Sequence, residues 1–187
     1  MKSLIIYGSQ YGTTKRYAET FSQMSGIPAV SYQTIPSLTG CELILHFGGL
    51  YAGHVKGLHT TLKSCSPDTR LVIVTVGLAD TSDEKNTNAI KKAVLRQLPK
   101  SFPSHVDIFH LRGGIDYSKL KMTHKVMMTL LYHKAKALPD EQKTGEIQAM
   151  IETFNQKVDF TDYHTLKPLF NLLPEPQELS PIFQGGQ

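Results

Sequence analysis

A hydroxyl-rich loop near the N-terminus carries the clearest chemical signal in the sequence. The loop, residues 8–14, follows the short apolar run from Leu4 to Tyr7 and leads into a segment with helical periodicity. A helix N-terminus offers free backbone amides and the positive end of the helix dipole, and both stabilise a phosphate. The loop has neither the Gly-Lys-Ser/Thr ending of a P-loop nor the Gly-x-Gly-x-x-Gly spacing of a dinucleotide fold. It therefore suits a terminal monophosphate, although its hydroxyls could instead only cap the helix.

Apolar runs that alternate with helical patterns must position this loop. We expect strands at residues 4–7, 29–32, 42–47, 71–76 and 106–111, and helices at residues 14–24, 55–64, 86–98 and 146–158. Runs such as Leu43-Ile44-Leu45 are apolar on both faces, which is typical of parallel strands covered by helices on each side. The sequence therefore predicts an α/β fold, a doubly wound five-stranded parallel sheet with helices on both faces, in which the last helix closes one layer.

Ligands in such sheets bind beyond the carboxyl ends of the strands. There the order Ser9-x-x-Gly12-Thr13-Thr14 resembles the FMN phosphate loop of flavodoxins, over roughly residues 1–158. The resemblance implies a flavodoxin-like fold with non-covalently bound FMN, whose ring lies between the loops after the third and fourth strands. The residues that it assigns to cofactor binding are Ser9, Gln10, Tyr11, Gly12, Thr13 and Thr14, then Gly48, Gly49, Leu50, Tyr51, Ala52 and Gly53, then Val76, Gly77, Leu78, Ala79 and Asp80.

Individual side chains in these loops have two interpretations each. Tyr51 could stack on the flavin or lie at the edge of the core. His54 could relay a proton to the flavin, or form ordinary surface hydrogen bonds. Backbone amides near Gly49 and Ala79 could bind polar atoms of the ring. We assign no catalytic residue and no metal ligand.

Within the flavodoxins, the chain is most similar to the bacterial flavodoxin-like protoporphyrinogen oxidases. The similarity depends on residues 51–54 and on residues 112–117, which lead into a segment containing Met122, Met127 and Met128. Three functions remain open. The first is electron transfer to or from a partner oxidoreductase. We favour it because no acid or base for a dehydrogenation is evident in the sequence. The second is oxidation of a tetrapyrrole with electrons passed to a quinone, and the third is a flavin-free interaction module.

A basic insert separates the fifth strand from the last helix at about residues 113–139. The insert holds five lysines from Lys119 to Lys136 and no acidic residue in that stretch. The whole chain has a formal charge of +4 and a sequence pI of about 9.0. The charge is local, so it does not indicate nucleic-acid binding. We expect its apolar residues to share one helical face that packs on the domain, while a redox partner or peripheral contact with a membrane through Lys119–Lys136 remains an alternative.

The remaining features concern the ends of the chain and its compartment. We expect residues 1–159 to form the domain, and residues 160–187, which contain four prolines, to be an extended or partly disordered tail. Only two cysteines occur, Cys41 and Cys65, in no metal-binding or redox motif, and no apolar run is long enough to span a bilayer. These features predict a cytoplasmic protein.

Overall fold

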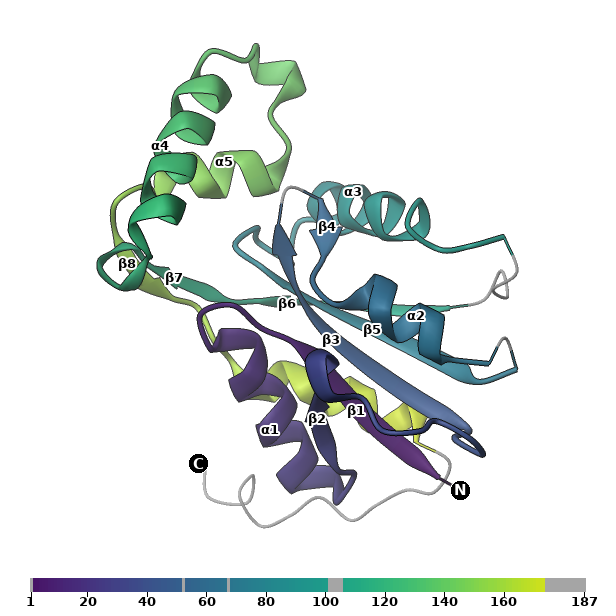
Figure 1. Cartoon of the computed structure of the whole chain (residues 1–187). Coiled ribbons are helices and arrows are strands. Elements are labelled where there is room, and N and C mark those ends of the chain that lie inside the picture. The colour runs from purple at the N-terminus through teal and green to yellow at the C-terminus, as the bar shows by residue number, and fades with distance from the viewer. Residues whose placement is uncertain (1, 52, 67, 101–105, 174–187) are drawn as a thin grey trace, which may run out of the picture.

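A five-stranded parallel sheet forms the centre of the computed structural model, which describes residues 2–51, 53–66, 68–100 and 106–173 (Figure 1). All pairings in the order β2-β1-β3-β5-β6 are parallel. This order confirms the doubly wound α/β architecture predicted from the sequence. The strands are β1 (Ser3–Gly8), β2 (Ala29–Ser31), β3 (Leu43–Tyr51), β5 (Arg70–Gly77) and β6 (Asp107–Arg112), and β4 (His54–Val55) pairs antiparallel with the end of β3.

The sheet is buried on both faces because its strands are apolar at successive positions. Side chains alternate between the two faces of a strand, so Ile5 and Ile6 of β1 enter two different clusters. On one face α1 (Thr13–Ser25) packs Tyr17 and Phe21 against the sheet. On the other face α2 (Leu58–Ser64) and α3 (Glu84–Leu95) supply the apolar side chains of the second cluster.

The element that closes the first layer differs from the predicted one. The helix predicted at residues 146–158 is α5 (Gly145–Glu152), which packs on α3 and on α4 (Met122–Lys136). It ends early, and Asn155 takes a left-handed conformation with φ 59°. The chain then forms β8 (Lys157–Asp159), antiparallel to β7 (Gly114–Asp116).

A ten-residue 3₁₀ helix, η4 (Tyr163–Leu172), covers the sheet beside α1 instead. Leu166 and Leu169 are fully buried there, and Phe170 stacks edge-on against Phe21 with ring centroids 5.0 Å apart. The expectation of an extended tail is therefore wrong for residues 163–172. Residues 174–187, the rest of that predicted tail, lie outside the described residues.

Two helices stand apart from the sheet, above the carboxyl ends of its strands (Figure 1). We call α4, α5 and their connection, residues 122–152, the helical hairpin. Tyr132 of α4 stacks on Phe154, which follows the end of α5, with ring centroids 3.9 Å apart. The shorter 3₁₀ elements are η1 (Tyr32–Thr34), η2 (Tyr117–Lys119) and η3 (Asp140–Gln142). Among the helices that the structure describes, none has the length and hydropathy needed to cross a bilayer.

Candidate cofactor site

A cavity of about 670 Å³ lies between the carboxyl edge of the sheet and the helical hairpin. It lies beside the ends of β1 and β3, the switch point at which a sheet of this strand order binds its ligand. Its volume is that of a typical small-molecule or cofactor pocket. The predicted cofactor-binding residues that line it are Ser9, Gln10, Tyr11, Thr13, Thr14, Gly49, Leu50, Tyr51, Gly53, Val76, Gly77 and Leu78.

The N-terminus of α1 meets this cavity without a side-chain cap. Gly12 is the N-cap residue, with φ 99°, and no side chain bonds the first-turn amides, which also have no acid beside them. The Ser9 hydroxyl instead accepts a hydrogen bond from the Gly12 amide at 3.1 Å. The alternative in which the loop hydroxyls only cap the helix is therefore wrong. The positive end of the helix dipole and the Thr13 and Thr14 hydroxyls remain available to an anion.

Tyr51 supplies an aromatic face at the other side of the cavity mouth. It ends β3, lines the cavity and leaves 38% of its surface exposed. Partial burial raises the pKa of its hydroxyl, which keeps the phenol neutral. The Lys56 ammonium lies 5.8 Å from the ring centroid and donates to the side-chain oxygen of Gln10. A cation therefore stands beside the same loop that offers the helix N-terminus.

Other predicted site residues lie off the cavity wall. Gly48 is buried within β3, where an added Cβ would overlap Val55. The Asp80 carboxylate accepts hydrogen bonds from the Ser82 amide at 2.9 Å and hydroxyl at 2.8 Å, and these bonds lower its pKa. Ala52 lies outside the described residues. His54 is exposed and is not among the residues lining the cavity, an arrangement that matches the surface interpretation rather than a proton relay.

The most consequential residue that sequence reasoning missed is Glu146. Its carboxylate accepts hydrogen bonds from the amides of Leu78, at 3.0 Å, and Ala79, at 2.7 Å. Burial raises the pKa of this carboxyl, while the two amides and Arg112 oppose the rise. The Ala79 amide, expected to be available to the cofactor ring, is thus bonded to a side chain of α5. The sequence marks Glu146 only as a first-turn helix residue, so nothing in it indicated this contact.

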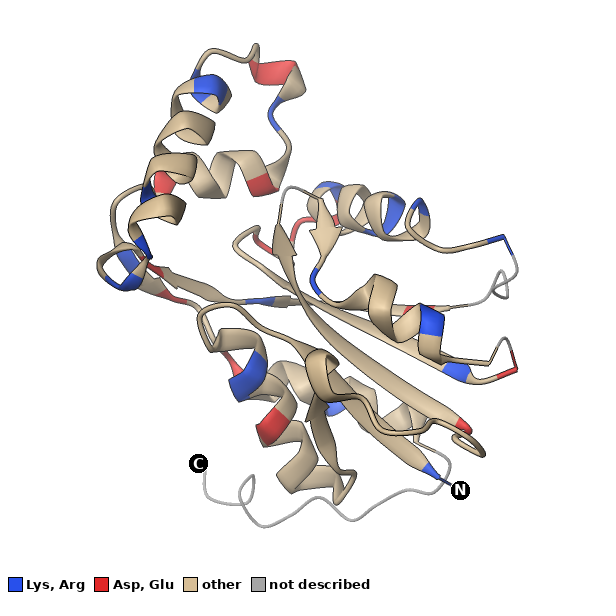
Figure 2. Ribbon diagram, in the orientation of Figure 1, with Lys and Arg blue, Asp and Glu red and all other residues tan. Residues whose placement is uncertain are grey.

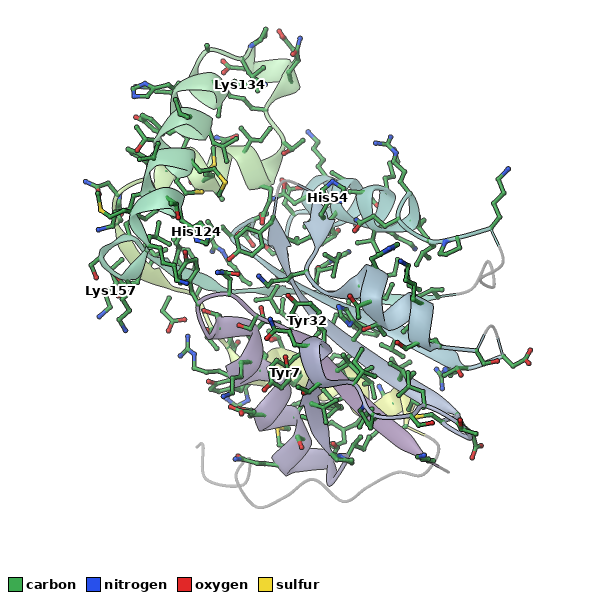
Figure 3. All side chains as sticks on the ribbon, viewed as in Figure 1. Tyr7, Tyr32, His54, His124, Lys134 and Lys157 are labelled. Atoms are coloured by element: carbon green, nitrogen blue, oxygen red, sulfur yellow. The ribbon has the colours of Figure 1, made fainter. Side chains whose placement is uncertain are left out.

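The helical hairpin forms the apolar wall of the cavity. Met127, Met128 and Leu131 of α4 line it opposite Ile90 and Ala93 of α3. His124, also on α4, hydrogen-bonds through Nδ1 with the Tyr11 hydroxyl, and the two rings meet edge-on with centroids 5.7 Å apart. Figure 3 shows His124 on the side of α4 that approaches the sheet. The methionines of the insert were a sequence signal, but their spacing could not say which of them would face the cavity.

The donors and surfaces of this cavity fit FMN. The uncapped helix with its hydroxyls suits a terminal phosphate, and Tyr51 with Leu50 suits a flat ring. The cavity wall is closely packed at Gly77, since an added Cβ there would overlap the Glu146 side chain and lie 2.9 Å from Leu50 Cδ1. Within the described residues, no group of three or more His, Cys, Asp or Glu side chains could hold a metal ion. The fold and the site together define a class, the doubly wound α/β proteins that bind a phosphorylated cofactor at the switch point.

Comparison with known families gives the class a name. The family model described as "Flavodoxin domain" matches residues 4–142, so the chain belongs to the flavodoxin domain family. The cofactor of this chain is FMN. The match does not support a narrower assignment to the protoporphyrinogen oxidases. No curated protein matches the chain in a sequence comparison.

Solved structures similar to this chain include three flavoproteins. A flavodiiron core from Synechocystis is 16% identical over 59% of this chain, with a TM-score of 0.38, and the match spans only 30% of that longer chain. An archaeal flavodoxin is 14% identical over 60% of this chain and 85% of its own, with a TM-score of 0.40. A mutant flavodoxin from Pseudomonas aeruginosa is 17% identical over 74% of this chain and 99% of its own, with a TM-score of 0.37.

Proposed function

We propose that this protein is an FMN-dependent redox protein that exchanges electrons with a partner oxidoreductase. The proposal rests on one observation. A helix N-terminus without a side-chain cap and an exposed aromatic face line the same cavity. Bound FMN supplies the electron chemistry, and the protein supplies binding, orientation and electrostatics. The free thiols of Cys41 and Cys65 suit a reducing compartment, and we propose the cytoplasm.

Each part of the chain has a distinct task in this proposal. The α1 N-terminus with Thr13 and Thr14 anchors the phosphate. Tyr51 packs against the ring from the end of β3. The helical hairpin covers the cavity with apolar side chains and so keeps water from the ring, which strengthens electrostatic interactions inside the site.

A second candidate is a flavin-dependent oxidase of a flat apolar compound such as a tetrapyrrole, with a quinone as acceptor. The observation that favours it is the apolar wall of Leu120, Met127 and Leu131, which could hold such a substrate beside the ring. Glu146 is the carboxyl group that lines the same cavity. It could exchange the proton that a dehydrogenation requires.

Comparison of FMN with riboflavin tests the cofactor site. Riboflavin lacks the phosphate, so the wild-type protein should bind it about 10-fold or more weakly than FMN. Thr13→Asp places a negative charge in the phosphate loop and should weaken FMN binding with little effect on riboflavin. The matched control, Thr60→Asp, changes an exposed threonine of α2 and should bind both as wild type. Equal affinity for the two flavins would contradict the phosphate assignment, and no binding of either would favour the interaction module.

The two redox functions are separated by the reactions of the loaded protein. Photoreduced FMN-loaded protein should return its electrons to a protein acceptor if it is a carrier. The oxidised form should be reduced anaerobically by a porphyrinogen if it is the oxidase. Reduction by the porphyrinogen at a rate that saturates with substrate would replace the carrier proposal by the second candidate.

A further inference from the structure

One side of α4 carries large apolar side chains that no other part of the described structure covers. Met122, Val126 and Leu130 recur at every fourth position, so they lie along one side of the helix. Their exposed fractions are 73%, 58% and 66%. They belong to α4, which stands apart from the central sheet in Figure 1.

The opposite side of the same helix meets the protein. Met127 and Leu131 line the cavity, and Ala135 is buried. The sequence expectation that the apolar residues of the insert share one face packed on the domain is therefore wrong for Val126 and Leu130. The apolar residues of α4 divide into two groups, and only one group is used by the fold.

Positive charge lies at both ends of the exposed group. No acidic residue occurs between Asp116 and Asp140, and the lysines of this stretch lie toward the two ends of α4 (Figure 2). Lys121 and Lys136 are exposed at the two ends of α4, and Lys125 lies next to Val126 in the sequence. We define the outer face of α4 as Lys121, Met122, Lys125, Val126, Leu130 and Lys136.

Three kinds of occupant could cover such a face, and its chemistry distinguishes them. A second copy of the chain would bring an equally basic helix against it, and like charges repel. The core of a specific protein interface is depleted in lysine, whereas here Lys121 and Lys125 lie near the start of the apolar stripe and Lys136 lies beyond its end. A basic helix with an aliphatic stripe matches an anionic bilayer surface, where lysines meet headgroup phosphates and apolar side chains enter the acyl boundary.

We propose that the outer face of α4 binds the surface of an anionic lipid bilayer, with the helix lying in the plane of the interface. Met122, Val126 and Leu130 enter the boundary of the acyl chains. Lys121, Lys125 and Lys136 lie at the level of the phosphates. The cavity, which the other side of α4 lines, then lies close to the membrane surface. This inference goes beyond the proposed redox function and does not require that FMN be bound.

Vesicle sedimentation of the full chain tests the proposal. The wild-type protein should sediment with vesicles of phosphatidylcholine mixed with phosphatidylglycerol, much less with phosphatidylcholine alone, and less as salt is raised. Val126→Gln combined with Leu130→Gln should weaken binding about 10-fold or more. Each of Lys121→Gln, Lys125→Gln and Lys136→Gln should weaken it about 5-fold.

Matched controls exist on α3. Leu95→Gln changes an aliphatic residue that is 42% exposed, and Lys85→Gln, Lys91→Gln and Lys92→Gln change exposed lysines. These variants should sediment as the wild type does. Within the described part of the chain, no outer-face residue belongs to either core cluster, so circular dichroism and the thermal midpoint of every variant should match the wild type.

Three results would overturn the proposal. One is wild-type protein that does not bind anionic vesicles, and another is outer-face variants that bind them as tightly as the wild type. The third is a dimer in solution that Leu130→Gln dissociates while vesicle binding persists, which would assign the face to a second copy. The second result has a special form, in which the outer-face variants bind vesicles as the wild type does but no longer transfer electrons to an acidic protein. That outcome would assign the face to a redox partner.

Discussion

The carboxylate of Glu146 accepts a hydrogen bond from the backbone amide of Ala79 at 2.7 Å, across 67 residues of sequence. The Leu78 amide donates a second hydrogen bond to the same carboxylate. Together the two bonds connect the first turn of α5 to the loop between β5 and α3. The two segments are in close contact, since an added Cβ at Gly145 would overlap the side chain of Asn86. The position of the helical hairpin over the cavity therefore depends in part on one side chain.

Removal of this side chain should loosen the loop. In Glu146→Ala the amides of Leu78 and Ala79 lose their acceptor, and we expect them to exchange with solvent deuterium about 10-fold faster or more. Hydrogen-exchange mass spectrometry of peptides covering residues 76–83 measures the change. Glu152→Ala, at the exposed far end of the same helix, is the matched control. Unchanged exchange in Glu146→Ala would show that the contact does not restrain the loop.

The same carboxyl should give a distinctive pH dependence. Burial raises its pKa above the usual value of 4.5, so the folded chain holds this proton more tightly than the unfolded chain. The stability linked to this proton is complete below the unfolded pKa and is lost as pH rises through the folded pKa. Glu146→Gln does not titrate. The free energy of unfolding of the wild type relative to the variant should therefore fall as pH rises through and above 4.5, as measured by urea denaturation over a series of pH values. A difference that is constant over this range would mean that the pKa is not raised.

Tyr51 should contribute to flavin affinity through its ring and not through its hydroxyl. Its aromatic face is exposed at the cavity, and an aromatic pair is worth about 0.5–1.5 kcal/mol beyond the area it buries. Tyr51→Leu should weaken FMN binding about 10-fold, whereas Tyr51→Phe should keep wild-type affinity. Fluorescence titration with FMN measures both. Equal loss in the two variants would move the contribution from the ring to the hydroxyl.

The sheet could be predicted because its signal is local. Runs such as Leu43-Ile44-Leu45 need cover on both faces whatever surrounds them, and the alternation of such runs with helical patterns predicts a parallel sheet with helices on both faces. The loop of Ser9, Gly12 and Thr13 was equally readable, since strand, loop and helix follow one another directly. Both predictions used only neighbouring residues.

The hairpin and the end of the chain could not be predicted in the same way. Periodicity shows that Met127 and Leu130 are both apolar on a helix, but not which of them meets a cavity built by other segments. Leu166, Leu169 and Phe170 have the spacing of a helical face, but the prolines of this segment, Pro168 among them, led to the prediction of an extended or partly disordered tail. A 3₁₀ helix accommodates this proline. The hydrogen-bond partners of Glu146 are backbone amides. The sequence does not indicate them, because nearly every residue has such an amide.

Two buried tyrosines should respond in opposite directions to loss of the hydroxyl. The Tyr117 hydroxyl is buried without a hydrogen-bond partner in the described structure. The Tyr17 hydroxyl donates to the Arg112 carbonyl at 2.8 Å and accepts from the Asp162 amide at 2.9 Å. Tyr117→Phe should therefore stabilise the protein by about 1 kcal/mol, and Tyr17→Phe should destabilise it by about 1–3 kcal/mol. Urea denaturation of the two variants in parallel measures both. Destabilisation by Tyr117→Phe would reveal a partner for its hydroxyl.

His46 should make the fold sensitive to mild acid. It is fully buried in β3, where its Nε2 donates to the Lys56 carbonyl at 3.0 Å and its Nδ1 accepts from the Thr61 hydroxyl at 2.9 Å. Burial lowers the pKa of His46 from 6.5 to about 4. Between these two pH values the unfolded chain binds a proton at this residue, whereas the folded chain does not. Stability should therefore fall as pH drops through this interval, by at most about 3 kcal/mol. His46→Gln keeps a donor for the carbonyl and does not titrate, so its unfolding free energy should lose correspondingly less over the same interval. An NMR titration that found the His46 imidazole half-protonated near pH 6.5 would contradict this account, because the neutral ring is what allows the side chain to remain buried between β3 and α2.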